Sequence, residues 1–269
     1  MLTFTSGKLP PAAAPEPRRE VLKFAFRQLP AEWARETSEP CWRAYWFTER
    51  TVFWRIGSQE VHPSPSEMLL IPPHTHTGRW YEKPCEHLYL HFSLGLNHHR
   101  FPDKIYRTDL TGRLKNVTEK LAALASGTNR KAFSYFDIIK LQELIYALLG
   151  SVPPDHWEAI HTKDKRILKT LRLMEEHLHV PLDNATLAGY ANVSTNAFAR
   201  LFARNMETPP QAYYMRLRLE KASLLLQYTS LSIETIADKC GFCDRSYFSK
   251  MFVQYRNVPP ARFRKLTDV

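Results

Sequence analysis

The chain has 269 residues and a formal net charge of +10, with 37 Lys and Arg against 27 Asp and Glu. This length allows two domains. Apolar runs stay well short of the ~20 residues of a membrane-spanning helix, and four cysteines are too few for a disulfide scaffold. A membrane-spanning protein and a secreted disulfide-rich protein are therefore excluded. The N-terminus shows no charged-then-apolar signal pattern, so we expect a cytoplasmic protein.

Charge and tryptophan are unevenly distributed along the chain. From Lys163 onward there are 17 Lys and Arg against 10 Asp and Glu, whereas residues 1–162 carry 20 against 17. All six tryptophans lie at or before Trp157. The two halves therefore differ in kind, and the basic C-terminal third is suited to a polyanion such as DNA. The alternative is a basic surface that only confers solubility.

The N-terminal half is predicted to be rich in β-strands after a flexible arm. Residues 1–19 are rich in Pro and Ala, which predicts the arm. Short apolar segments at 41–47, 51–56, 67–73 and 86–92 are separated by Gly, Pro and Ser. This spacing predicts an antiparallel β-barrel. The strand at 86–92 alternates polar and apolar residues, so its His87, Tyr89 and His91 should face the interior.

Two amphipathic helices are predicted at 113–126 and 134–149, because their apolar residues recur with the 3.6-residue period of a helix. The simplest interpretation is that they pack on the barrel. The segment Ser151-Val-Pro-Pro-Asp155 cannot continue a helix. We therefore expect a domain at 20–150, a linker at 151–163 and a second domain at 164–269.

The second domain contains a pattern that repeats after about 50 residues. A helix at 164–178 precedes the first copy, in which Asp183 and Ser194 are predicted to cap two helices. A long helical pattern at 212–227 connects it to the second copy, in which Ser232 caps one helix and another begins near Asp244. Each copy is predicted to be a helix-turn-helix, with Gly241 making the turn in the second.

The second copy also carries a specific motif. It is Ile233-x-x-Ile-Ala-x-x-x-Gly-Phe-x-x-x-Ser-Tyr-Phe-Ser-x-x-Phe252, followed by Pro259-Pro-x-x-Phe-Arg264. This motif resembles that of the AraC/XylS family of bacterial transcription regulators. The resemblance implies an α+β fold in two domains, with a cupin-like effector domain followed by two helix-turn-helix units joined by a long helix. It implies no cofactor. The expected partners are promoter DNA, a small-molecule effector, a second copy of the chain bound through helix 113–126 or 134–149, and RNA polymerase if the protein is an activator.

DNA contacts are expected at the outward-facing positions of the second helix of each unit. Asn is a bidentate partner of adenine and Arg of guanine, whereas Ala can touch only a thymine methyl. Any of these polar side chains can instead bind phosphate, which fixes register but not sequence. The candidates are Thr195, Asn196, Ala199, Arg200 and Arg204 in the first unit, and Arg245, Ser246, Ser249 and Lys250 in the second.

The chain departs from the family at the turn that follows each of these helices. The glycine usual before the Pro pair is Glu207 in the first unit and Asn257 in the second. Asn tolerates a left-handed backbone conformation, whereas Glu does so poorly. We therefore expect the turn at Glu207 to be built differently from the one at Asn257.

The effector is predicted to be a sugar or related polyol, because imidazole and phenol groups can bond hydroxyls and a tryptophan can cover a sugar ring. In the arabinose-responsive family member, the positions that match His87 and Tyr89 contact the sugar. The alternative is that the aromatic residues only fill the core. The candidates are Trp46, His76, Trp80, His87, Tyr89 and His91.

A metal-dependent cupin enzyme is the competing interpretation. His74-x-His76 followed by Glu82 approaches the spacing of a cupin metal site. The gap to Glu82 is longer than in that motif and the flanking glycines are missing, so we expect neither a metal nor catalysis. Cys240 and Cys243 have Cys-x-x-Cys spacing without a second pair, and we interpret Cys240 as a small core residue.

Overall fold

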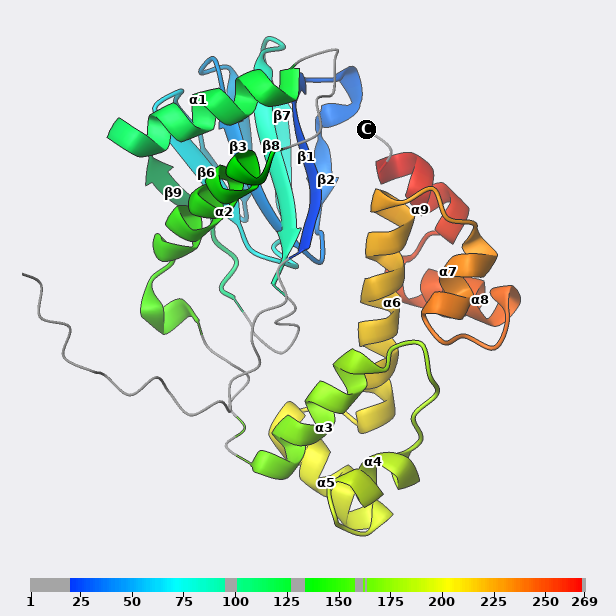
Figure 1. Cartoon of the computed structure of the whole chain (residues 1–269). Coiled ribbons are helices and arrows are strands. Elements are labelled where there is room, and N and C mark those ends of the chain that lie inside the picture. The colour runs from blue at the N-terminus through cyan, green and yellow to red at the C-terminus, as the bar shows by residue number, and fades with distance from the viewer. Residues whose placement is uncertain (1–19, 95–100, 127–133, 158–161, 163, 268–269) are drawn as a thin grey trace, which may run out of the picture.

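The computed structural model describes residues 20–94, 101–126, 134–157, 162 and 164–267, and Figure 1 shows two domains. Antiparallel sheets form the first and helices the second. The predicted arm at 1–19 lies outside the described residues, as does part of the predicted linker at 151–163. None of the described helices is long and apolar enough to cross a membrane.

The described strands of the first domain form two sheets. The five-stranded sheet has the order β1-β8-β3-β6-β9, with β1 at Glu20–Gln28, β8 at Glu86–Ser93, β3 at Trp42–Phe47, β6 at Glu67–Ile71 and β9 at Tyr106–Asp109. The four-stranded sheet has the order β2-β7-β4-β5, with β2 at Arg35–Thr37, β7 at Thr77–Tyr81, β4 at Val52–Ile56 and β5 at Gln59–Val61. A 3-10 turn, η1 (Ala31–Trp33), separates β1 from β2.

The predicted barrel is not closed, which corrects the expectation from the sequence. The two sheets share no ladder of hydrogen bonds between described strands. Both edge strands of the smaller sheet, β2 and β5, have only three residues, which is too short to continue the pairing around a barrel. The two sheets instead pack face to face, with Tyr45, Trp54 and Tyr89 in the core between them.

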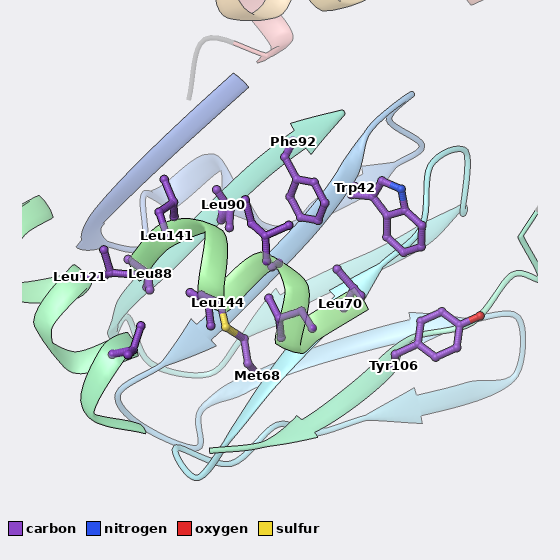
Figure 2. Packing of buried hydrophobic residues seen from close by; sticks show 14 of the residues in the cluster. Trp42, Met68, Leu70, Leu88, Leu90, Phe92, Tyr106, Leu121, Leu141 and Leu144 are labelled. Atoms are coloured by element: carbon purple, nitrogen blue, oxygen red, sulfur yellow. The ribbon is translucent and has the colours of Figure 1, made fainter. Parts of the chain in front are cut away.

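The outer face of the five-stranded sheet is covered by α1 (Gly112–Ser126) and α2 (Tyr135–Gly150), close to the predicted bounds. Figure 2 shows Leu141 and Leu144 of α2 over Leu88, Leu90 and Phe92 of β8. The alternate residues of β8 therefore point to opposite sides of the sheet, and His87, Tyr89 and His91 face the smaller sheet. After α2, a 3-10 turn, η2 (Pro154–His156), leads to Trp157, which stacks on Trp42 with ring centroids 5.8 Å apart.

The second domain is helical. Its elements are α3 (Lys165–Glu176), α4 (Asn184–Tyr190), α5 (Thr195–Met206), α6 (Pro210–Tyr228), α7 (Ile233–Lys239), α8 (Arg245–Arg256) and α9 (Pro260–Thr267). The first half of α6 packs with α3, α4 and α5, and its second half packs with α7, α8 and α9 (Figure 1). The 50-residue repeat is visible in the core, because Phe202 and Phe252 are both fully buried in their own clusters.

The turns after α5 and α8 have the same backbone conformation. Glu207 has φ 55° and ψ 18°, and Asn257 has φ 59° and ψ 12°, so both residues are left-handed. The expectation that the turn at Glu207 is built differently is therefore wrong. The helix end determines the conformation, and Glu207 adopts it despite the steric cost of its Cβ.

Replacing Glu207 with glycine should therefore stabilise the protein by about 1 kcal/mol, because glycine adopts this conformation without the Cβ clash. Asn257→Gly is the matched control and should have a smaller effect, since Asn tolerates the left-handed region. Denaturant unfolding of both variants measures the difference. Equal or opposite effects of the two substitutions would contradict this account of the turn.

Candidate DNA interface and effector pocket

The N-terminal ends of α5 and α8 present polar side chains to solvent. Ser194 Oγ accepts a hydrogen bond from Ala197 N (3.4 Å), and Asp244 Oδ1 accepts one from Tyr247 N (2.7 Å), so both helices begin with a side-chain cap. The buried phenylalanines on the opposite face determine which face is exposed. The exposed candidates are Thr195, Asn196, Arg200, Arg204, Arg245, Ser246 and Lys250, whereas Ala199 and Ser249 are half-buried.

These two faces are held apart by α6, whose 19 residues correspond to about 28 Å of helix. The two helix clusters also meet directly. Gly241 has φ 71°, and a Cβ there would lie 2.9 Å from the backbone of Leu178 and His179. A second contact comes from the Arg218 side chain of α6, which donates a hydrogen bond to the Cys240 carbonyl. Cys240 is fully buried beside them, as the sequence predicts for a small core residue.

A pocket lies in the first domain, at the end of the sheets that faces α6. Its mouth is open to solvent. Nine of its lining residues come from the first domain, and Gln227 comes from α6. The lining consists of Lys23, Arg27, Trp33, Arg35, Tyr45, Arg79, His87, Tyr89, His91 and Gln227.

Only three of the six predicted effector residues lie in this pocket, namely His87, Tyr89 and His91. Trp46 is adjacent to Tyr45 on β3 and therefore points to the other side of the sheet, where it stacks on Phe26. Trp80 stacks on Phe53 with a centroid distance of 5.5 Å, away from the pocket lining. The exposed His76 lies 3.2 Å from Glu36 and is also outside the pocket.

The cationic side of the pocket was missed by sequence reasoning, although half of it carries a signal. Lys23 and Arg27 lie four residues apart on β1, on the same face of the strand, and they pair in register with His91 and His87 of β8. The alternation of β1 places Lys23, Ala25 and Arg27 on one face of the strand. This face, with two basic residues around a small one, could have been recognised from the sequence as a basic face. Arg79 and Gln227 come from segments distant in sequence, and no local pattern identifies them.

Burial keeps both pocket histidines neutral. Desolvation, with Arg27 and Arg79 nearby, lowers the pKa of His87 to about 3, although its hydrogen bond to the Arg27 carbonyl acts in the opposite direction. Desolvation is also the main reason that the pKa of His91 lies well below its usual value, followed by the charges of Arg43 and Arg79. Each neutral ring therefore has one donor and one acceptor nitrogen.

A hydrogen-bonded chain connects the pocket with α6. Arg79 donates to Tyr45 Oη (3.1 Å), Tyr45 Oη lies 2.9 Å from His91 Nε2, and His91 Nδ1 lies 2.8 Å from Tyr228 Oη. Tyr228 also contacts Cys41 Sγ at 3.4 Å. The last turn of α6 therefore joins the helical domain to two residues of the pocket lining, Tyr45 and His91.

Two further contacts join the domains nearby. Arg256 at the end of α8 donates to the Ser38 carbonyl at 3.2 Å. His74 Nε2 lies 3.6 Å from Glu220 Oε1 of α6. Although this distance fits an ion pair, desolvation lowers the pKa of His74 to about 4 and raises that of Glu220. Both shifts favour the neutral forms, so we regard the contact as a polar one rather than a salt bridge.

The residues of the alternative metal site do not come together. His74 faces Glu220 of the second domain, and His76 faces Glu36 of β2. Within the described parts of the chain, no three His, Cys, Asp or Glu side chains are grouped in a way that could hold a metal ion. The Cys240 and Cys243 thiols are both free, one buried and one exposed.

Comparison with known proteins gives a family for the C-terminal region. Residues 187–266 match the family described as a helix-turn-helix domain. The HTH-type transcriptional regulator GbdR of Pseudomonas aeruginosa is 38% identical over 109 residues, which are 40% of this chain and 29% of that protein. The HTH-type transcriptional activator RhaS of an Enterobacter species is 31% identical over 156 residues, 58% of this chain and 55% of RhaS. The chain thus spans between about a third and a half of the length of these relatives.

The whole chain also has a structural neighbour. The crystal structure of ToxT from Vibrio cholerae aligns with 93% of this chain and 100% of its own, with a TM-score of 0.56 and 11% sequence identity. At this identity the similarity concerns the fold. It shows that sheets followed by a two-cluster helical domain occur together in one known architecture.

Proposed function

We propose, from the AraC-type helix-turn-helix domain to which the C-terminal region belongs, that the protein is a sequence-specific DNA-binding transcription regulator acting in the cytoplasm. The observation that carries this proposal is the pair of capped helices, α5 and α8, whose exposed faces bear polar and basic residues at corresponding positions. Such helices fit the major groove and contact base edges near their N-termini. The two relatives described above are regulators by name, and neither is an enzyme by name.

DNA binding should be strongly dependent on salt. The basic faces neutralise phosphates and release counterions, so affinity for a duplex selected from random sequences should fall about a hundredfold between 50 and 200 mM salt. Fluorescence anisotropy of the full chain with labelled duplex measures this. A salt-independent affinity, or no binding to duplex DNA at 50 mM salt, would contradict the proposed function.

We further propose that a small-molecule effector, a sugar or related polyol, binds in the pocket and controls DNA binding. Two features support this proposal. The second ring nitrogen of His87, whose Nδ1 bonds to the Arg27 carbonyl, and the phenol group of Tyr89 offer a donor and an acceptor for hydroxyls. The chain of bonds from Arg79 to Tyr228 connects the pocket with α6, so a change in the pocket can alter how the helical domain is held.

A homodimer formed through α2 is the proposed assembly. Its support is an exposed apolar stripe along this helix, in which Tyr135 is 89% and Ile139 57% exposed, four residues apart. Phe136 beside them is 64% exposed. Apolar surface of this kind on one helix is typical of an interface between identical subunits, in which the same patch meets itself.

Ile139→Glu should therefore weaken dimerisation by at least about tenfold, because it places a charge in the apolar stripe. Val180→Glu is the matched control, since Val180 is also partly exposed (36%) but lies outside α2. Sedimentation velocity across a concentration series measures both variants. A monomeric wild-type chain, or equal effects of the two substitutions, would rule out this interface.

A further inference from the structure

The buried apolar residues of the helical domain divide into two groups that share only α6. The first helix cluster packs α3, α4 and α5 against the first half of α6, where its last buried residue is Leu217. The second helix cluster packs α7, α8 and α9 against the second half, where its first buried residue is Leu219. Apolar packing is not directional, so these two separate cores do not by themselves fix how one cluster is oriented relative to the other.

Tyr214 ties the middle of α6 to the first cluster through the loop between α3 and α4. Its ring is buried in the core of that cluster. Its hydroxyl donates to two backbone carbonyls of the loop, that of His177 at 2.5 Å and that of Val180 at 2.6 Å. The backbone between these two residues is therefore held against α6.

Arg218 lies one turn further along α6 and ties it to the second cluster. The side chain is only 7% exposed, and its guanidinium donates a hydrogen bond to the Cys240 carbonyl in the turn between α7 and α8. Its Cζ lies 4.4 Å from the centre of the Phe242 ring and 5.7 Å from the centre of the Tyr214 ring. Arg218 therefore contacts both the turn of the second cluster and the residue that holds the loop of the first.

The loop and the turn come together at Gly241. A Cβ on this residue would lie 2.9 Å from backbone atoms of Leu178 and His179 and 3.0 Å from the Arg218 side chain. Glycine is thus required both by its φ of 71° and by this close approach. The two clusters are therefore close enough here to exclude any side chain between their backbones.

We propose that Tyr214 and Arg218 are positioning residues for DNA recognition. With Gly241 they form a junction that holds α5 and α8 in one preferred relative orientation, so that the protein reads two DNA segments at one spacing. Phe242 connects the junction to α8, because its ring lies 5.0 Å from that of Phe248. Two linked binding modules gain affinity only when their geometry lets both engage at once. This inference rests on the proposed DNA-binding function and adds the residues that set its spacing.

The dependence of DNA binding on spacing tests the inference with the full chain. Footprinting first identifies the two protected segments of the selected duplex. Further duplexes then have one or two base pairs inserted or removed between these segments, or have one segment scrambled. Each base pair rotates one segment by about 34° relative to the other and moves it by about 3.4 Å. We expect the wild type to bind each altered spacing at least about tenfold more weakly.

Variants of the junction separate positioning from a direct DNA contact. Tyr214→Phe removes the hydroxyl and keeps the ring, and Arg218→Met removes the guanidinium. Each should bind the complete duplex about tenfold more weakly, bind the duplexes with one segment scrambled as the wild type does, and be less sensitive to spacing. Arg216→Met is the matched control and should keep the wild-type spacing dependence. It removes the same charge from another side of α6, where Arg216 pairs with Glu220 at 3.2 Å.

A distance measurement tests the junction without DNA. Cys243 is the exposed one of the four free thiols, so it is first replaced by Ser. Spin labels at Arg204→Cys of α5 and Lys250→Cys of α8, both exposed positions, then report the distance between these helices. We expect one narrow distance distribution with the wild-type junction and a broader one with Tyr214→Phe or Arg218→Met.

Three results would overturn the inference. The first is a wild type that binds all spacings equally. The second is an equal loss of affinity by the junction variants for the complete and the scrambled duplexes, because this would indicate a role in folding or phosphate binding. The third is an unchanged distance distribution in both variants. If Arg218→Met does not fold, Tyr214→Phe decides. A chain that binds no duplex DNA would refute the proposed function, whereas the label distances would still test the junction.

Discussion

Alanine at Arg200 or Arg245 should weaken binding to the selected duplex by about 1–3 kcal/mol, which is roughly five- to 150-fold. Arg200 is exposed in the middle of α5 and Arg245 is the exposed first residue of α8. The buried phenylalanines behind them, Phe202 and Phe248, fix the exposed faces. A bidentate contact with guanine would be lost in each variant, so the preference at one base pair should also relax.

The matched control for the arginine variants is Arg50→Ala, which removes an exposed arginine from the sheet domain. Affinities for the selected duplex and for all single-base variants of it, measured at one salt concentration, separate two cases. Loss of discrimination at one position identifies a base contact. Uniform weakening at every position would show that the arginine binds phosphate and does not contribute to sequence recognition.

Acidification from pH 7.5 to pH 5 should destabilise the sheet domain by about 2 kcal/mol through His87, and His91 should add to the loss in the same direction. The folded-state pKa is about 3 for His87 and well below the usual 6.5 for His91, in both cases mainly because of burial. Below pH 6.5 the unfolded chain therefore binds more protons than the folded one. The stability is complete above pH 6.5 and is lost as the pH falls toward 3. His74 is excluded, because the raised pKa of its neighbour Glu220 acts in the opposite direction.

Denaturant unfolding followed by tryptophan fluorescence measures this dependence, since all six tryptophans lie in the first 157 residues. His87→Gln should reduce the slope of unfolding free energy against pH by up to about 1.4 kcal/mol per pH unit. His76→Gln removes an exposed imidazole and is the matched control. A slope reduced equally by both substitutions would show that burial of His87 is not the cause.

The helical domain could be predicted from the sequence more completely than the sheet domain. Helix caps such as Ser194 and Asp244 are local signals, and α5 and α8 begin directly after them. The buried Phe202 and Phe252 recur at the fixed spacing of the repeat. The sheets depend on pairing between distant segments. The three-residue strands β2 and β5 are too short to show alternation, and they are the edges at which the predicted barrel stays open.

The same difference applies to the pocket. The alternation of β8 predicts that His87, Tyr89 and His91 share a face, and the structure places all three in the lining. Trp46 was predicted to bind the effector only because it is aromatic. It is adjacent to Tyr45 on β3, so its side chain points to the opposite side of the sheet. Arg79 and Gln227 enter through the packing of whole elements, so their role becomes visible only in three dimensions.

The contacts between the domains have a consequence for α5 and α8, the two helices proposed to contact DNA. The polar contacts described between the domains involve the second half of α6 and the end of α8, through Glu220, Tyr228 and Arg256. The cluster of α3, α4 and α5 lies at the far end of α6 (Figure 1). The two helices are therefore mechanically unequal. Arg256 of α8 contacts the sheet domain directly, whereas the polar contacts between the domains described above include none from α5. If the proposed effector alters these contacts, the half of a bound promoter that faces α8 would respond to the effector, and the half that faces α5 would mainly contribute sequence recognition.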